Sequence, residues 1–262
     1  MLHKKSLGQN FLKSKTALSA MVDAGNPTLN DTVLEIGPGE GILTEGLLKL
    51  AGKVIVVEKD RRLIPYLEEK FSEEIKVGKL DVIEKDILGF DINLLNFYTH
   101  PYKIIANIPY YITGQVIRKF LEAENQPESM TLLVQKEVAE RIIVKDKKES
   151  LLSLSVKIFG KPKYIRTVGR GAFAPQPNVD SAIIHISDIS RKNFDGISEE
   201  KFFEILHTGF AHKRKQLLSN LSGLYTKDMI SHAFEVCKLN PKCRAEDVSL
   251  TQWISLIKGL EN

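Results

Sequence analysis

The feature that most constrains the fold is an alternation between two kinds of segment over the first 190 residues. Short apolar runs rich in β-branched residues alternate with segments whose apolar residues have the spacing of a helix. Continuous apolar runs indicate strands buried on both faces, and intervening helices make the crossovers that parallel strands need. The pattern therefore predicts a mainly parallel sheet with helices on both faces. The expected strands span 32–36, 53–58, 79–86, 102–107, 130–135, 163–168 and 181–186, and the expected helices span 41–50, 61–71, 113–124 and 136–159.

The C-terminal part of the chain has a different pattern. The last two expected strands, 163–168 and 181–186, follow each other without a helix, which predicts an antiparallel last strand. Residues 199–260 contain no good strand, and their apolar residues recur at spacings of three and four, which predicts three to five short helices. We therefore expect an α/β domain over residues 1–190 and a small all-α domain over residues 191–262.

A glycine-rich loop, Gly37-Pro38-Gly39-Glu40-Gly41, follows the first expected strand and precedes a helix. Glycines allow a tight turn and the close approach of a ligand, and this edge of an open α/β sheet is where ligands bind. The spacing is neither the G-x-G-x-x-G of dinucleotide enzymes nor the phosphate-binding loop ending in Lys-Ser/Thr. The loop thus indicates a ligand site without a phosphate cradle, with a plain strand-to-helix turn as the alternative.

Two acidic residues stand at the ends of the next two expected strands. Glu58 ends the second strand, where a carboxylate can accept hydrogen bonds from both hydroxyls of a ribose. Asp86 ends the third, where its side chain could reach an adenine amino group. Either acid alone is more often a solvated strand end, but together with the loop they indicate an adenosine-containing cofactor. Because no phosphate site is evident, S-adenosyl-L-methionine is favoured over NAD.

The fourth strand delivers Asn107-Ile108-Pro109-Tyr110 to the same edge. The exocyclic amine of adenine is a poor nucleophile, and two acceptors on its N–H groups would direct its lone pair at a methyl sulfonium. The side-chain carbonyl of Asn107 and the main-chain carbonyl of Ile108 can serve, with Pro109 fixing the backbone. Tyr110 offers a face on which an extruded base can stack. Such a displacement depends on proximity and alignment and needs no metal. The alternative is an Asn-x-Pro turn with core tyrosines.

Four segments together closely resemble the adenine N6,N6-dimethyltransferases of small-subunit ribosomal RNA. They are LGQNFL (7–12), EIGPGEGILT (35–44), NIPYYIT (107–113) and FAPQPNVDSAI (173–183). The Asn-x-Pro-Tyr motif alone marks amino methyltransferases broadly, whereas the set of four is much more specific. The resemblance covers nearly the whole chain. It implies the Rossmann-like sheet of class I S-adenosylmethionine-dependent methyltransferases and a C-terminal helical domain that binds RNA.

The resemblance also implies roles for individual residues. The implied cofactor contacts are Asn10, Leu12, Gly37, Gly39, Glu58, Asp86 and Asn107, and the implied catalytic residues are Asn107, Pro109, Tyr110 and Phe173. Phe173 would close the other side of the target base. It lies between prolines in an expected loop, where an exposed ring would suit stacking, although loop phenylalanines more often fill a core.

A basic run begins the segment HKRKQLLSNL (212–221), which is expected to be a helix. Cations at the start of a helix oppose its dipole, which suggests another reason for Lys213, Arg214 and Lys215, and contact with RNA phosphates is one. The alternative is a solvated basic face. The formal net charge of +4 permits nucleic-acid binding without demonstrating it.

The leading functional hypothesis is dimethylation of two adjacent adenosines in the 3′-terminal hairpin of small-subunit rRNA, with a role in subunit assembly. A large-subunit adenine methyltransferase of the macrolide-resistance type is an alternative, against which the Asp180-Ser181 ending of the fourth segment argues. A non-catalytic RNA-binding assembly factor should have lost cofactor or catalytic residues. A DNA amino methyltransferase should have a separate base-recognition domain.

Localisation and partners follow from what the sequence lacks. It has no secretory signal and no apolar run near the roughly 18 residues of a membrane span. Its two cysteines, Cys237 and Cys243, are interpreted as reduced thiols. We expect a cytoplasmic monomer that binds no membrane and no structural metal, with small-subunit rRNA or its precursor particle as partner.

Overall fold

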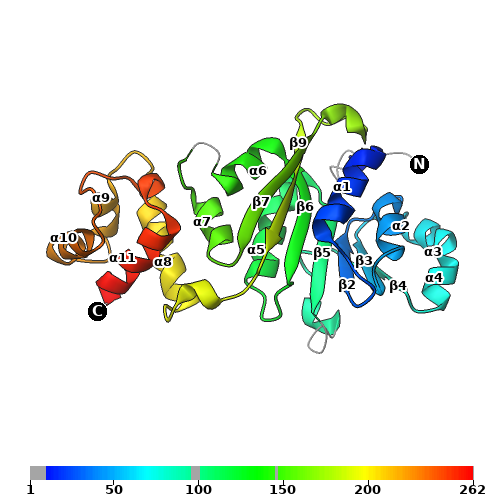
Figure 1. The fold of residues 1–262 in the computed structure, drawn as a ribbon, viewed down its shortest axis with the longest axis horizontal. Coiled ribbons are helices and arrows are strands. Elements are labelled where there is room, and N and C mark those ends of the chain that lie inside the picture. The colour runs from blue at the N-terminus through cyan, green and yellow to red at the C-terminus, as the bar shows by residue number, and fades with distance from the viewer. Residues whose placement is uncertain (1–9, 96–100, 145–146, 262) are drawn as a thin grey trace. The chain divides into compact units, whose positions relative to one another are not determined.

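The computed structural model describes residues 10–95, 101–144 and 147–261 (Figure 1). The chain divides into two compact units, the first formed by the residues before 140 with 160–189, and the second by 140–159 with 190–262. The sequence predicted one boundary near residue 190, whereas the structure groups 140–159 with the C-terminal helices. The packing of Phe159 explains this grouping, because its ring lies edge-on to Phe194 with centroids 5.2 Å apart.

The first unit is built on a seven-stranded sheet of order β4-β3-β2-β5-β6-β9-β7. From β4 to β6 all neighbouring strands are parallel, and β9 is antiparallel to both β6 and β7. This confirms a mostly parallel sheet with an antiparallel last strand. The strands are β2 (Thr32–Ile36), β3 (Lys53–Glu58), β4 (Leu80–Glu84), β5 (Tyr102–Asn107), β6 (Ser129–Gln135), β7 (Lys161–Val168) and β9 (Ser181–Ser187).

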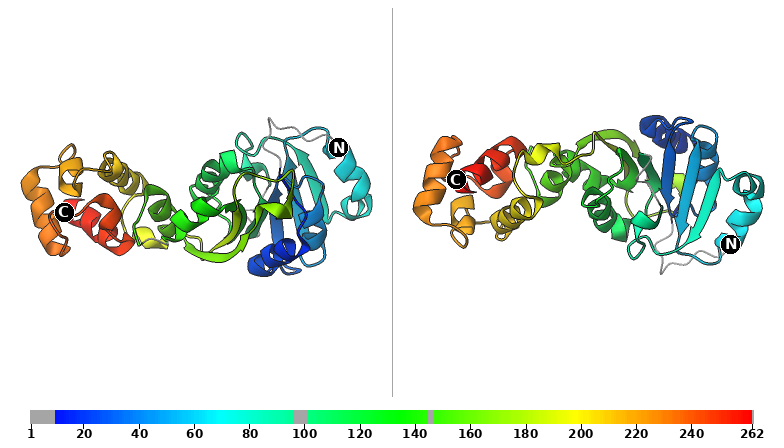
Figure 2. Two further views of the ribbon diagram at one scale, coloured as in Figure 1. Left: turned by 90° about the horizontal axis from the view of Figure 1, so that it is seen from above. Right: turned by 90° about the horizontal axis from the view of Figure 1, so that it is seen from below.

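Helices cover both faces of this sheet, and the two views in Figure 2 place α1 and α5 on opposite faces. The sequence did not predict α1, which Ser14 caps by accepting a hydrogen bond from the main-chain N–H of Ala17 at 3.3 Å. It predicted one helix over 136–159, which is wrong, because the capping box of Ser150 and Ser153 begins a new helix. The helices before this break are α1 (Lys15–Gly25), α2 (Ile42–Leu48), α3 (Ile64–Lys70), α4 (Ser72–Lys76), α5 (Thr113–Leu121) and α6 (Lys136–Ile143). The new helix, α7 (Leu151–Lys157), belongs to the second unit.

The second unit is helical, and its residues within the described ranges form no strand. Besides α7 it contains α8 (Glu199–Phe210), α9 (Leu217–Leu221), α10 (Lys227–Val236) and α11 (Leu250–Glu261). Trp253 is fully buried in its core and stacks on Phe210 with ring centroids 5.9 Å apart. Across both units, none of the helices in the described ranges is long and apolar enough to cross a bilayer.

Gly52 marks the tightest point of the backbone in the first unit. A Cβ atom there would lie 2.1 Å from the main-chain oxygen of Leu29. We expect Gly52→Ala to destabilise the protein by about 2–3 kcal/mol, because the backbone must shift to relieve the overlap. The matched control is Gly114→Ala, where a Cβ would meet nothing within 4 Å. Scanning calorimetry checks this, and equal melting temperatures for the two variants would contradict it.

Candidate active site

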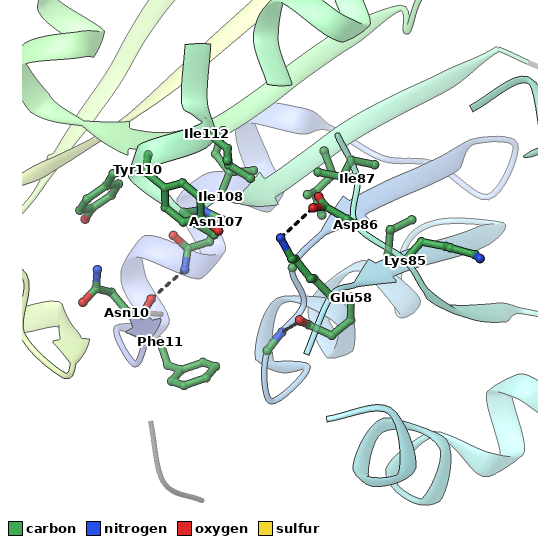
Figure 3. A pocket seen from close by; sticks show the side chains of 17 residues that line it. Asn10, Phe11, Glu58, Lys85, Asp86, Ile87, Asn107, Ile108, Tyr110 and Ile112 are labelled. Carbon is green, nitrogen blue, oxygen red and sulfur yellow. Dashed lines mark hydrogen bonds and ion pairs between the residues drawn. The ribbon is translucent and has the colours of Figure 1, made fainter. Parts of the chain in front are cut away.

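A pocket of about 770 Å³ opens where β2, β3 and β5 end (Figure 3). It lies at the ligand-binding edge of a parallel sheet. The sequence-predicted residues that line it are Asn10, Gly37, Gly39, Glu58, Asp86, Asn107, Pro109 and Tyr110. The structure thus brings together residues from four strand ends and from the N-terminal arm, by which we mean residues 10–12.

The glycine loop needs its glycines. Gly37 and Gly39 have φ angles of 67° and 60°, in the left-handed region that side chains disfavour. A Cβ on Gly39 would also lie 2.6 Å from the ring of Phe11 in the N-terminal arm. The main-chain N–H of Gly39 donates to Glu58 Oε2 at 3.3 Å. The absence of side chains therefore lets the loop contact both the arm and the acid of β3.

Glu58 ends β3, and its side chain is only 5% exposed. Its Oε1 accepts a hydrogen bond from the main-chain N–H of Asp60 at 2.7 Å, in addition to the bond from Gly39 to Oε2. Burial raises the pKa of this carboxyl, and the two main-chain donors work in the opposite direction. A carboxylate fixed in this way keeps acceptor capacity on the pocket side for the hydroxyls of a ribose.

The sequence predicted that the third strand ends at Asp86. In the structure β4 ends at Glu84, so Asp86 lies two residues beyond it. Its Oδ1 accepts from the main-chain N–H of Leu88 at 3.1 Å, and its Oδ2 pairs with Lys59 Nζ at 2.7 Å. The bond from Lys59 lowers the pKa of Asp86, so this acid is ionised beside the pocket. Sequence reasoning missed Lys59, which also lines the pocket and is identifiable only through its position next to Glu58.

Asn107 is joined to the N-terminal arm, since its Nδ2 donates to the main-chain oxygen of Asn10 at 3.2 Å. The arm continues as β1 (Phe11–Leu12), which pairs with β8 (Phe173–Ala174) in a separate two-stranded sheet. Leu12 is buried and lines a neighbouring cavity of about 350 Å³, which Asn107 also borders. The structure therefore places Asn10 and Asn107 at the main pocket and Leu12 beside it.

Tyr110 lines the pocket from the one-turn helix that follows Pro109. Its ring is half-buried, and its hydroxyl lies 2.6 Å from Ser181 Oγ. The sequence left two alternatives for Phe173 in its expected loop, an exposed stacking ring or a residue that fills the core, and the structure shows the second, in a short strand. Its side chain is 6% exposed and belongs to the hydrophobic core cluster that includes Leu12. The reason is the pairing of β8 with β1, which a sequence pattern does not reveal for strands of two residues.

A second buried acid, Glu35 of β2, accepts a hydrogen bond from the Thr44 hydroxyl at 2.6 Å. Burial raises the pKa of Glu35 from 4.5 to about 8, Thr44 lowers it, and the nearby Glu58 raises it further. Between about pH 4.5 and about pH 8 the folded protein therefore keeps a proton on Glu35 that the unfolded chain releases. The free energy of unfolding therefore falls as the pH rises through this window.

We expect Glu35→Gln to remove this fall, because a neutral amide keeps the acceptor for Thr44 without carrying a charge. At high pH the variant should be more stable than the parent protein by on the order of 3 kcal/mol, and below about pH 4 the two should converge. Denaturation followed from about pH 5 to about pH 9 checks this window. Parallel pH profiles for the two proteins would show that Glu35 is ionised in the folded state.

The basic run of the second unit differs from its prediction. Lys213, Arg214 and Lys215 are exposed in the connection between α8 and α9 and do not begin a helix. The side chain of Asn220 donates to the main-chain oxygens of Gly209 and His212 and so ends α8 before this run. The dipole argument for these cations is therefore wrong, whereas their exposure leaves them accessible to a polyanion.

The pocket residues suit S-adenosyl-L-methionine. The carboxylates of Glu58 and Asp86 can accept hydrogen bonds from the ribose and the adenine, and they complement the positive charge of a sulfonium. Gly37 leaves room for the cofactor against the backbone, because a Cβ there would meet only Pro109 at 4.0 Å.

The comparisons with known proteins concern the whole chain. The family model "Ribosomal RNA adenine dimethylase" matches residues 1–262. Ribosomal RNA small subunit methyltransferase A of Dehalococcoides mccartyi is 43% identical over 260 residues, covering 97% of this chain and 87% of the relative. The protein of the same name from Fusobacterium nucleatum is 38% identical, with 99% and 98% covered.

Two solved structures resemble the whole chain. The 23S rRNA methyltransferase ErmE superposes with a TM-score of 0.80 at 25% identity, covering 97% of this chain and 100% of that one. A dimethyladenosine transferase from Plasmodium falciparum gives a TM-score of 0.77 at 26% identity, with 94% and 95% covered. The protein is an S-adenosyl-L-methionine-dependent enzyme, and the chain belongs to the ribosomal RNA adenine dimethylase family.

Proposed function

We propose that the protein transfers methyl groups from S-adenosyl-L-methionine to the N6 amines of two adjacent adenosines in the 3′-terminal hairpin of small-subunit rRNA. The observation that carries the proposal is the meeting of two sets of residues in one pocket. Glu58 and Asp86 line it on the cofactor side, and Asn107 and Tyr110 line it where a target base would enter. The names of the curated relatives support the small subunit as the source of that base.

The cofactor supplies an activated methyl group attached to a positively charged sulfur. Among the residues of this chain, Glu58 accepts hydrogen bonds from the ribose and Asp86 accepts one from the adenine amine. Lys59 keeps Asp86 ionised through their ion pair of 2.7 Å. These residues hold and orient the donor without taking part in proton transfer.

Asn107 and Ile108 act on the amine that is methylated. Because Asn107 Nδ2 donates to Asn10, its Oδ1 is the atom that can accept from the target N–H. The main-chain oxygen of Ile108 accepts from the second N–H, and the two contacts direct the nitrogen lone pair along the line of displacement. Bound S-adenosyl-L-methionine would supply the methyl group, and Asn107 and Ile108 would hold the amine in line with it until the surplus proton on nitrogen passes to solvent. Tyr110 supports the base by stacking.

Phe173 stays a predicted second stacking residue. Because its ring is buried against the core, it can contact the base in one of two ways. Either the segment 170–180 changes its conformation, or the base approaches the edge of the ring. The proposed enzyme acts in the cytoplasm as a monomer, in late small-subunit assembly. Sedimentation equilibrium of the free protein at a mass well above one chain would contradict the monomer.

We further propose that the exposed run at residues 213–215 binds RNA phosphates. Replacing Lys213 and Lys215 together by alanine should weaken RNA binding about tenfold and lower the slope of log K against log salt by about one to two. The charge-matched control replaces Lys227 and Lys242, which are exposed in the same unit. Filter binding across a salt series measures both slopes, and identical slopes for the two double variants would mean that this run is a solvated surface.

The function is tested with radiolabelled cofactor and three substrates from a strain that lacks the modification: small subunits, large subunits and naked rRNA. We expect N6,N6-dimethyladenosine in small-subunit RNA, identified by chromatography of the nucleosides. Label in large-subunit RNA would instead assign the activity of the ErmE type, which shares the fold. Cofactor binding without transfer to any substrate would indicate a non-catalytic RNA-binding factor.

A further inference from the structure

The hydroxyl of Tyr110 has a partner that the reaction itself does not require. It lies 2.6 Å from Ser181 Oγ, and Ser181 has no exposed surface at all. Tyr110 is only half-buried and lines the pocket, so a partly exposed ring is joined to a fully buried hydroxyl. A stacking role needs the face of the ring, whereas this contact uses its polar tip.

Ser181 is held firmly because it begins β9, the strand that lies between two neighbours. It stands opposite Gln135 of β6 and opposite Val168 of β7 in the observed register. The preceding residue adds two ties, since the Asp180 main-chain oxygen accepts from Lys136 N at 3.0 Å and its Oδ1 accepts from Arg170 N at 3.0 Å. The position of the Ser181 hydroxyl is therefore set by the sheet.

A second connection joins the motif from Asn107 to Tyr110 to the segment 170–181, this time through the N-terminal arm. The main-chain N–H of Lys13 donates to Ala172 O at 2.8 Å, and Leu12 pairs with Phe173. The arm then reaches Asn107 through the Asn10 carbonyl. The motif from Asn107 to Tyr110 is thus fastened at both ends to the segment 170–181, through the arm at one end and through Ser181 at the other. Figure 3 shows the first of these ties, the bond between Asn107 and Asn10.

We propose that Ser181 is a positioning residue for methyl transfer, which fixes where the Tyr110 ring lies so that the stacked base meets the acceptors of Asn107 and Ile108. This inference rests on the proposed function. The hydroxyl oxygen of a tyrosine lies on the axis about which its ring turns, so a hydrogen bond from it to a fixed partner limits the swing of the whole ring about the Cα–Cβ bond. Methyl transfer is sensitive to the alignment of amine and methyl group, so a ring free to tilt lowers the rate more than it lowers the affinity.

The test compares Ser181→Ala, Tyr110→Phe and the double variant in steady-state methylation of small-subunit particles. Each should lower kcat about tenfold with KM and cofactor Kd nearly unchanged, and the double variant should lose no more than either single variant. Thr131→Val is the matched control, because this fully buried hydroxyl of β6 bonds to His185 instead, at 2.9 Å. Its kcat should equal that of the parent protein.

Tyr110→Phe probes the same bond from the half-buried side and keeps the proposal testable if Ser181→Ala folds poorly. Losses that multiply in the double variant, or wild-type kcat in both single variants, would overturn the positioning role. A readout independent of activity is the tyrosine Cζ resonance of Tyr110 in labelled protein. It should shift in Ser181→Ala and stay in place in Thr131→Val. If the parent protein is inactive but the resonance shifts in Ser181→Ala, the contact exists and the proposed function is wrong. If the parent protein is active but the resonance does not shift in Ser181→Ala, the contact is wrong.

Discussion

We expect Asn107→Ala to lower the rate of methyl transfer at saturating cofactor by about a thousandfold, the largest effect of any single substitution in this chain. The lost group is an acceptor placed in advance at the point where the amine changes its geometry. Asn107 lines the pocket, and the Asn10 carbonyl fixes its amide through the 3.2 Å bond to Nδ2. Alanine removes both the acceptor and this tie to the arm, while the backbone of β5 stays in its ladder.

The measurement is single-turnover transfer to small-subunit particles, with cofactor affinity determined in parallel by calorimetry. Asn30→Ala, an exposed asparagine away from the pocket, controls for the loss of an amide and should react at the parental rate. Asn107→Asp keeps an acceptor but turns a second oxygen toward the Asn10 carbonyl. Its rate should lie between that of Asn107→Ala and that of the parent protein. A rate for Asn107→Ala within tenfold of the parent protein would mean that the amine is activated elsewhere.

The second large effect concerns the cofactor. Glu58→Ala should weaken binding of S-adenosyl-L-methionine about a hundredfold or more, because it removes a charged acceptor for the ribose. The same change leaves the main-chain N–H groups of Gly39 and Asp60 without their present acceptor. The glycine loop then loses its attachment to β3, so both the contact and the shape of the pocket are affected.

The control for this substitution is Glu84→Ala. Glu84 ends β4 directly opposite Glu58 in the parallel register, yet it is exposed and does not line the pocket. Calorimetric titration with the cofactor and with its demethylated product should give parental affinities for this variant. Equal losses at Glu58 and Glu84 would show that the effect comes from the charge of the sheet edge and not from a specific contact.

The sequence was sufficient to predict the middle of the sheet because its strands there are buried. A run such as that of β3, with Val54 to Val57 buried, has too few polar residues to be anything but a central strand. The pocket could be predicted for the same reason, since the ends of parallel strands meet at one edge whatever the loops do. Glu58, Asp86 and Asn107 therefore came together as expected.

What escaped prediction depends on contacts between distant residues. Phe173 is buried by pairing with Leu12, about 160 positions earlier in the chain, and no local pattern reports that pairing. The break between α6 and α7 depends on a capping box. The apolar spacing continues across this break, so the spacing alone predicted one helix. Lys59 was missed because a lysine after a strand is usually solvated, and only the structure places it against Asp86.

The placement of β9 between β6 and β7 has a consequence for how the chain folds as it is synthesised. When the ribosome has made only the residues up to 168, β7 has no partner, because the strand that joins it to the sheet comes later in the sequence. Until that strand emerges, β6 presents an unpaired edge on which another chain can add. The insertion of β9 closes this edge and, in the same step, brings Ser181 to Tyr110. A nascent chain therefore completes its catalytic pocket and loses its aggregation-prone edge in one event.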